Sequence, residues 1–362
     1  MEFHVDISNK VDQKVWNDNL AQSEFANGYQ VANLAMVYHD SFESIPLFIY
    51  VKNSNDKVVG QLAATINTKY YLRDSNVVLR VIGTKLKLNP ILRWEYGPII
   101  HDKSNHDKIL TKILSAIDAI SLKNRVTMIR GTTSPLGIQL PNQIFEKYGY
   151  QKKDWGTYVT DLNQNIDELY GKLSKETRYD IRKSEKIGLE FSIARDFESF
   201  NEHNELSFRV KKNRGEAVKP WKLFNKKFWE NLYEDGYLSV LQVKKDGKVL
   251  AGIDALVFNR NVLQYSVVNS PEGQHLQVGS FLTWNAIKWS MDMKYQTYDM
   301  GGINPKPENV KEKSINFYKS KWGGRQLDYI RFVKVLSNVR FKLSTALSNP
   351  KKVKNKISKI MH

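Results

Sequence analysis

The sequence contains no cysteine among its 362 residues. A disulfide framework, a thiolate nucleophile and a metal site with cysteine ligands are therefore excluded. No run approaches the roughly 20 apolar residues that a membrane-spanning helix needs. The first ten residues mix acids, amides and a histidine, and lack the basic and then apolar order of a signal peptide. These absences predict a cytoplasmic protein.

Several familiar catalytic motifs are also missing. There is no glycine-rich phosphate loop, no His-Glu-x-x-His and no Gly-x-Ser-x-Gly, and the seven histidines are scattered along the chain. We therefore expect no metal site and no bound cofactor, so that any group donor acts as a co-substrate.

Acidic residues are few relative to basic ones, 38 against 55, which gives a net charge of +17. Such an excess indicates an anionic partner, which can be a nucleic acid, a phosphorylated substrate or an anionic membrane. Charge alone does not choose among them. Hydrophobic residues make up 41% of the chain, enough to fill two cores, and the length favours two domains.

The same order of predicted elements occurs twice along the chain. Residues 46–65 and 237–257 each contain two apolar strands joined by a polar turn. Residues 127–135 and 296–305 each contain a short strand that ends in a turn of small residues. In both cases the next predicted element is a helix, which ends with an aromatic residue and a glycine. A further strand follows this helix. Three pairs of similar segments thus occur in the same order, offset by roughly 170 to 190 residues, and they predict a duplicated unit.

The predicted helices agree with a duplication. Residues 106–123 and 279–294 both carry apolar side chains at helical spacing. We predict an α/β (α+β) protein of two such units, each a mixed, mostly antiparallel sheet flanked by helices. We expect domain 1 to span residues 1–162 and domain 2 to span 163–326. Residues 327–362 should add a strand and a basic helix that pack back on domain 1.

The final segment, residues 337–362, contains seven lysine and arginine residues and no acid. The spacing of its apolar residues predicts a basic amphipathic helix interrupted at Asn349–Pro350. Such a helix can contact an anionic membrane surface from the cytoplasmic side. The alternative is a solvated tail.

A stripe of basic residues follows one face of the helix predicted near residues 172–189. Lys175, Arg178, Arg182 and Lys186 are spaced by three, four and four residues. Guanidinium groups match phosphate oxygens, so the stripe can bind a diphosphate. The alternative is an ordinary solvated helix face.

Three segments resemble the signatures of the Fem family of aminoacyl-tRNA-dependent peptidyltransferases. Residues 176–191, ETRYDIRKSEKIGLEF, are similar to the helix that opens the family's second domain. Residues 298–324, which begin YDMGGINP and end NFYKSKWGG, resemble its Tyr-Asp-Leu/Met-x-Gly-Ile and Phe-Lys-x-x-Phe/Trp-Gly-Gly segments. Residues 93–100, RWEYGPII, are similar to a strand end of the family. The resemblance covers essentially the whole chain and implies two tandem GNAT-like domains.

The resemblance also implies an activity and its residues. Fem-type enzymes move an aminoacyl group from aminoacyl-tRNA to an amine of a nucleotide- or lipid-linked muropeptide, a precursor of cell-wall peptidoglycan. Lys319 would stabilise the charge that develops at the acyl ester, beside Tyr318 in the substrate site. Arg178 and Arg182 would bind the diphosphate of the acceptor, with Tyr96 as a further substrate-binding residue.

Candidates for the proton acceptor are His101 and Asp102, which follow the Tyr-Gly-Pro segment. Asp299 is expected to shape the turn before Gly301 and Gly302 and not to act as a base.

Other functions stay open. An acyl-CoA-dependent N-acyltransferase of the same fold could act on a sugar, lipid or peptide amine, although the loop around Gly279 lacks the full pyrophosphate-binding pattern of GNAT enzymes. A non-catalytic nucleic-acid binder would explain the positive charge, but no recognised binding module is present. A duplicated domain without activity is the third alternative.

Overall fold

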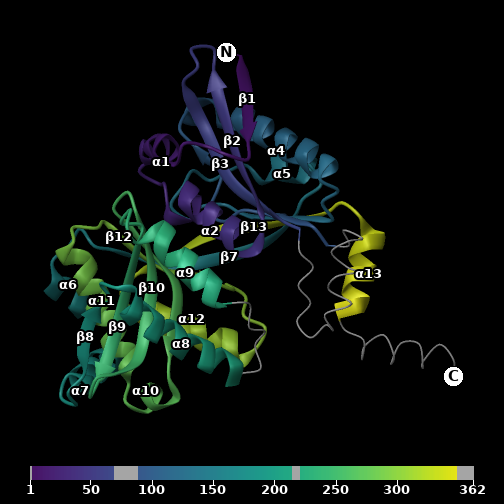
Figure 1. The fold of residues 1–362 in the computed structure, drawn as a ribbon. Helices are drawn as coiled ribbons and strands as arrows, with labels where there is room; N and C mark the ends of the chain where they lie inside the picture. Colours follow the sequence, from purple (N-terminus) through teal and green to yellow (C-terminus); the bar gives the residue numbers. More distant parts are fainter. Residues whose placement is uncertain (1, 69–88, 214–220, 349–362) are drawn as a thin grey trace. The chain divides into compact units, whose positions relative to one another are not determined.

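The computed structural model describes residues 2–68, 89–213 and 221–348 (Figure 1). The chain divides into two compact units, and each is built from separate stretches of sequence. Unit 1 consists of residues 1–23, 30–153 and 331–362, and unit 2 of residues 24–29 and 154–330.

Unit 1 is built on a mixed sheet. Its first two long strands form the hairpin expected at residues 46–65. The pairing of β4 with β6 is parallel, and the other pairings are antiparallel. In sheet order the strands are β1 (Phe3–Ser8), β2 (Ile45–Asn53), β3 (Val58–Asn67), β4 (Ile91–Arg93), β6 (Met128–Thr132) and the end of β13 (Arg325–Val335), while β5 (Ile99–Ile100) also pairs with β3.

Helices of unit 1 accompany this sheet. They are α1 (Gln13–Ala21), α2 (Ala32–Phe42), α4 (His106–Lys123), α5 (Asn142–Lys147) and α13 (Asn338–Ser348). Helix α4 covers the residues predicted for it, because Ile109, Ile113 and Ile117 form a fully buried stripe. Helix α13 begins the basic helix expected at the end of the chain, whose expected continuation over residues 349–362 lies outside the described residues.

Unit 2 has a mixed sheet of the same plan. The hairpin expected at residues 237–257 is present as β9 and β10. Strands β11 and β12 pair in parallel over three residues only, from Asn261 to Leu263, and the other pairings are antiparallel. In sheet order the strands are β7 (Gln151–Asp161), β12 (Thr297–Ile303), β11 (Asn261–Asn269), β10 (Lys248–Phe258), β9 (Leu238–Lys245) and β8 (Glu190–Ile193).

The helices of unit 2 lie on both faces of its sheet. Helix α11 contacts α7, β9 and β10, and its Trp284 and Trp289 belong to the buried core, as expected. Helix α8 contacts β10 and β11 (Figure 1). The helices are α6 (Ile166–Lys172), α7 (Lys175–Ser184), α8 (Phe197–Asn213), α9 (Trp221–Leu232), α10 (Pro271–His275), α11 (Val278–Asp292) and α12 (Val310–Ser320).

The last strand of each repeat completes the sheet of the other repeat. Strand β7 follows the first repeat along the chain, yet its residues 156–161 pair with β12 in unit 2. Strand β13 follows the second repeat, yet its residues 331–335 pair with β6 in unit 1. A glycine in the left-handed conformation precedes each of these two strands: Gly149 at φ 79° before β7, and Gly323 at φ 71° before β13. The predicted fold class, duplicated α/β units on mixed sheets, is confirmed.

Candidate active site

A bulge in β12 forms the centre of the candidate site. Asp299 pairs with Val159 of β7, whereas Gly302 pairs with Thr157. Two residues of β12 therefore stand opposite one residue of β7, which is the pattern of a β-bulge. Gly301 lies in the bulge at φ 77°, a conformation that glycine adopts without steric cost.

Asp299 holds the bulge in shape. Its carboxylate is buried, with the residue 3% exposed, and its Oδ1 accepts a hydrogen bond from the Gly301 N–H at 2.7 Å. The hydroxyl of Thr157 lies within hydrogen-bonding distance of the same carboxylate oxygen and, at 2.8 Å, of the Gly301 carbonyl oxygen. The carboxylate thus shapes the turn, as expected from the sequence, and its oxygen is committed to protein donors.

Lys319 reaches this bulge from the last turn of α12. Its Nζ donates hydrogen bonds to the carbonyl oxygens of Gly301 at 2.8 Å and Gly302 at 3.1 Å. Burial lowers the pKa of Lys319 to about 8, and the nearby Asp299 carboxylate opposes that shift. An ammonium group has three N–H donors, and two are used here. The third can donate to the oxygen of a bound acyl group.

Tyr318 connects α12 to the first turn of α11. Its hydroxyl donates to the Gly279 carbonyl oxygen at 3.0 Å and lies 2.8 Å from the Thr283 hydroxyl. The ring packs edge-on against Trp322, and burial raises the pKa of Tyr318 to about 12. The phenol is therefore neutral at physiological pH, and it positions the helix segment from which Lys319 extends.

The two arginines of the predicted stripe have different surroundings. Arg178 donates from Nη1 to the carbonyl oxygens of Gly171 at 2.8 Å and Leu173 at 3.0 Å, which closes the carboxyl end of α6. Arg182 is exposed on α7, and its Nη1 lies 3.4 Å from the hydroxyl of Tyr170. Arg178 thus has a structural contact, while Arg182 presents its guanidinium to solvent.

Tyr96 lies in unit 1, within the turn between β4 and β5. The residue is 4% exposed, and its backbone is in the left-handed region at φ 49°, just before a cis Gly97–Pro98 bond. Its N–H donates to the Thr132 hydroxyl at 2.8 Å.

The two candidate proton acceptors, His101 and Asp102, also lie in unit 1. His101 is largely buried beside Gln61, and burial lowers the pKa of its imidazole to about 4, so the ring is neutral at pH 7. Asp102 accepts hydrogen bonds from the N–H and the hydroxyl of Ser104, which lowers the pKa of its carboxyl group. The structure thus brings Lys319 and Tyr318 together within unit 2 and places Tyr96, His101 and Asp102 in the other unit.

Sequence reasoning did not identify Thr157 or the carbonyl oxygens of Gly301 and Gly302. Thr157 stands in a strand 142 residues before its partner Asp299, and no local pattern marks such a pair. A signal for the bulge did exist, because two successive glycines after a buried strand residue indicate a strand irregularity.

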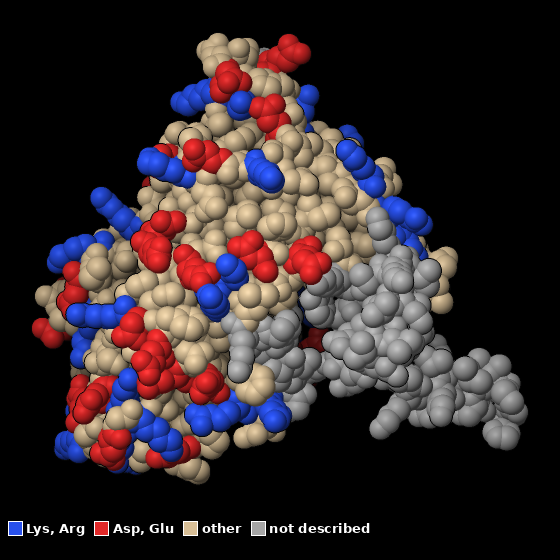
Figure 2. All heavy atoms as spheres, viewed as in Figure 1, with Lys and Arg blue, Asp and Glu red and all other residues tan. Residues whose placement is uncertain are grey.

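Charged side chains of both signs are interspersed on the face drawn in Figure 2. The net charge of the chain is therefore not gathered into one basic patch on the described residues of that face. No helix within the described ranges is both long and apolar enough to cross a bilayer.

The sequence of unit 2 matches a known enzyme domain. Residues 171–319 match the family model of the acetyltransferase (GNAT) domain, and the matched segment ends at Lys319. The chain thus carries an acyltransferase domain, as expected for an enzyme of the predicted class. No curated protein sequence matches the chain.

Solved structures share the fold of the whole chain at low sequence identity. FemX superposes with a TM-score of 0.70 at 14% identity, over 95% of this chain and 99% of that one. A tandem GNAT protein from the clavulanic acid biosynthesis pathway gives 0.57 at 13% identity, over 93% and 99%. The C-terminal domain of a putative lysylphosphatidylglycerol synthetase from Agrobacterium fabrum gives 0.56 at 13% identity, over 94% and 97%. These matches confirm the tandem GNAT fold.

Proposed function

Starting from the acyltransferase domain in unit 2, we propose that the protein is a Fem-type aminoacyltransferase. It would transfer an aminoacyl group from aminoacyl-tRNA to an amine of a nucleotide- or lipid-linked muropeptide. The observation that carries this proposal is the Lys319 ammonium, which is anchored on two carbonyl oxygens of the β12 bulge with one donor left. The likeness to FemX over nearly the whole chain supports it.

The chemistry follows from that geometry. The acceptor amine attacks the ester carbonyl carbon, and negative charge develops on the carbonyl oxygen. The remaining N–H of Lys319 donates to this oxyanion, which is the kind of interaction that lowers the barrier of acyl transfer. The bond to the ribose oxygen of the tRNA then breaks, an amide forms, and the ribose oxygen takes up a proton. His101 and Asp102 are the candidates for receiving the proton that the amine loses.

Binding of the acceptor would involve the remaining predicted residues. Arg182 is exposed on α7, with one nitrogen near the Tyr170 hydroxyl, and its guanidinium would bind a phosphate group. Arg178 holds the end of α6 with one nitrogen, and its other guanidinium nitrogen can face the same phosphate. Tyr96 is the proposed substrate-binding residue of unit 1.

An acyl-CoA donor is the second candidate. It is favoured by the match of residues 171–319 to an acetyltransferase domain. Two side chains lie close to the amino end of α11, where a pyrophosphate would bind. A Cβ on Gly279 would lie 3.1 Å from the Asn269 amide nitrogen and 3.6 Å from the Tyr318 hydroxyl. The sequence around Gly279 lacks the full pyrophosphate-binding pattern of GNAT enzymes, so aminoacyl-tRNA is the first candidate donor.

The place of action would be the cytoplasm. The basic segment that begins with α13 would contact the inner face of the membrane when the acceptor is lipid-linked. Binding of the full chain to anionic vesicles and not to neutral ones would support this contact.

A transfer assay with two donors tests the proposed function. The full-length protein is incubated with a UDP-linked muropeptide and either a mixture of aminoacyl-tRNAs or acetyl-CoA, and the acceptor is weighed by mass spectrometry. We expect a mass increase of one aminoacyl group with the tRNA mixture. An acetylated acceptor formed from acetyl-CoA alone would replace the proposal by its alternative.

A further inference from the structure

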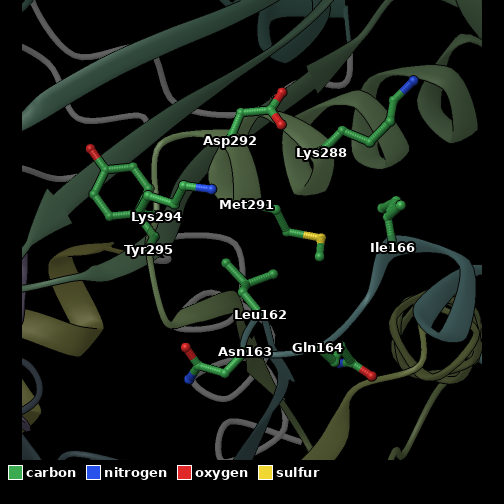
Figure 3. Close-up of a pocket in the computed structure, with 9 residues that line it drawn as sticks. All are labelled: Leu162, Asn163, Gln164, Ile166, Lys288, Met291, Asp292, Lys294 and Tyr295. Atoms are coloured by element: carbon green, nitrogen blue, oxygen red, sulfur yellow. The ribbon is translucent and has the colours of Figure 1, made fainter.

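Unit 2 contains a cavity that the proposed reaction does not use (Figure 3). Its volume is about 610 Å³, within the range of sites for small molecules. The loop after β7, the carboxyl end of α11 and the segment leading into β12 surround it. We infer that this cavity is a second binding site, for a small amphiphile with one anionic group on an apolar body. The inference does not depend on the proposed function.

The cavity is distinct from the candidate active site. Gly279, which contacts Tyr318, lies in the first turn of α11, whereas Asp292 at the cavity is the last residue of that helix. Asp292 comes thirteen positions after Gly279, a length of about 20 Å along the helix at 1.5 Å per residue. Likewise, the cavity adjoins the segment before β12, and the bulge with Gly301 comes toward the end of that strand. A ligand of the cavity would therefore not contact Lys319.

The floor of the cavity is apolar. Leu162 is 5% exposed and belongs to the hydrophobic core of unit 2, and Ile166, Met291 and Tyr295 pack against that core. In Figure 3 the side chains of Leu162, Ile166 and Met291 border one common space, although they come from the loop after β7, from α6 and from α11. An apolar body that covered them would remove hydrophobic surface from water.

The rim of the cavity carries charges without protein partners. Lys288, Asp292 and Lys294 line the cavity, and none of them forms an ion pair with any residue in the described part of the chain. Other lysines of the same unit are paired, for example Lys248 with Glu272 at 2.5 Å. Two positive charges against one negative charge leave an excess that favours a single anionic group. In Figure 3 the ammonium of Lys294 extends toward the cavity, whereas Lys288 lies on α11 at its edge with its ammonium pointing away from the other lining residues.

The loop that forms one wall is held in place before any ligand binds. The Leu162 N–H donates to the Gln296 carbonyl oxygen at 2.8 Å, and the Asn163 N–H donates to the Asp161 carboxylate at 2.9 Å. Asn165 caps α6 by accepting from the Asp167 N–H at 2.8 Å. A wall that is already ordered reduces the entropy cost of binding.

The chemistry of the ligand follows from floor and rim together. Its anionic group, a carboxylate or a phosphate, would contact the ammonium group of Lys294, with the charge of Lys288 at the edge of the cavity adding to the attraction, while its apolar part covers Leu162 and Met291. Asp292 and the carboxyl end of α11, which carries partial negative charge, would disfavour a ligand with a second anionic group nearby. A neutral alcohol of the same length lacks the ionic contact and should bind more weakly.

The inference is tested by isothermal titration calorimetry on the full-length protein with octanoate, octyl phosphate, octanol and inorganic phosphate. We expect octanoate or octyl phosphate to bind at one site per chain. Which of the two binds more tightly shows whether the natural ligand carries a carboxylate or a phosphate. The combined variant Lys288→Ala and Lys294→Ala should weaken this binding about tenfold or more, since the charge-assisted contact is lost. Octanol and inorganic phosphate should each bind at least tenfold more weakly than the amphiphile.

The control variant is Lys311→Ala with Lys313→Ala, which removes two exposed lysines of α12 outside the cavity. It should leave the affinity unchanged, and thermal unfolding of both double variants should match that of the parent protein. Met291→Gln, which makes the floor polar, should weaken octanoate and octyl phosphate alike. Equal affinity for octanol, an unaffected Lys288/Lys294 double variant, or absence of binding by both amphiphiles would each overturn the inference.

Discussion

The two units share one plan but differ at the position of the candidate active site. When they are aligned on Gly149 and Gly323, which both precede the exchanged strands, Lys319 of unit 2 corresponds to Phe145 of unit 1. Phe145 is fully buried and stacks on Phe332 with ring centroids 3.7 Å apart. One unit thus fills this place with an aromatic ring, and the other fills it with an amine.

The strands that correspond to each other in the two units, β6 and β12, also differ in their pairing. Strand β6 of unit 1 pairs with β13 in unbroken register from Met128 to Thr132. Strand β12 of unit 2 pairs with β7 through a register shift between Asp299 and Gly302. Of these two corresponding strands, only β12, in the unit that has the lysine, carries a bulge within the described residues. We assign the secondary structure that the two units share to packing, and the bulge of β12 with Lys319 to the chemical step.

Replacement of Phe145 tests the packing half of this comparison and should have the largest effect. Phe145→Ala should lower the free energy of unfolding by about 3–5 kcal/mol, because it leaves a cavity beneath Phe332. Urea unfolding followed by circular dichroism measures the change. At a temperature where the variant is folded, its turnover should be near that of the parent. A loss of turnover in the folded protein would show that the packing around Phe145 also determines activity, and would contradict this division of roles.

Replacement of Lys319 tests the chemical half. Lys319→Met keeps the length and the apolar stem but removes the charge, and should lower kcat by about a hundredfold to a thousandfold with KM nearly unchanged. Steady-state kinetics of aminoacyl transfer measure both constants. Lys321→Met is the matched control, since Lys321 lies on the same stretch and pairs with Glu176 at 3.7 Å. Equal losses in both variants would remove Lys319 from its proposed role.

The two arginines of α7 sharpen the distinction between structure and binding within unit 2. Arg178→Ala should lower the free energy of unfolding by about 1–3 kcal/mol, because two carbonyl oxygens at the end of α6 lose a charged donor. Arg182→Ala should change it by less than about 0.5 kcal/mol, as is usual at exposed positions. Only the second variant should raise KM for a phosphorylated acceptor while leaving thermal stability unchanged. The reverse result would exchange the two assignments.

The pH dependence gives the smallest effect and follows from the lowered pKa of Lys319. The ammonium form is required to stabilise an oxyanion, so kcat should fall to half near pH 8 and continue to fall above it. Stability should change in the opposite direction. Between pH 8 and the ordinary lysine pKa of 10.5, the unfolded chain binds more protons than the folded one, so the contribution of Lys319 to the free energy of unfolding rises with pH. A flat kcat from pH 7 to 9 would contradict the ammonium role.

Periodic patterns made much of the fold predictable from the sequence. Both hairpins were located, α4 was predicted to the residue, and α11 begins and ends within two residues of its predicted bounds. These elements are amphipathic or bounded by polar turns, so local residues suffice to define them. The division into residues 1–162, 163–326 and 327–362 stays a prediction.

The contacts of the site were less predictable because they join distant segments. Lys319 was chosen by family resemblance, but its anchoring on Gly301 and Gly302 depends on how α12 packs near β12. The stripe on α7 was visible as spacing, yet nothing local shows that Arg178 closes the preceding helix, since that depends on the angle between α6 and α7. Spacing predicts which face a side chain occupies, and tertiary packing decides what it meets there.

The exchange of final strands has a consequence for how such a protein can evolve. If either repeat were deleted, the remaining one would have a central strand, β6 or β12, without the neighbour that now completes its ladder. A strand edge that is opened in this way can pair with another chain and so promotes aggregation. The exchange therefore makes each repeat depend on the other for a complete sheet, which opposes the loss of either repeat alone.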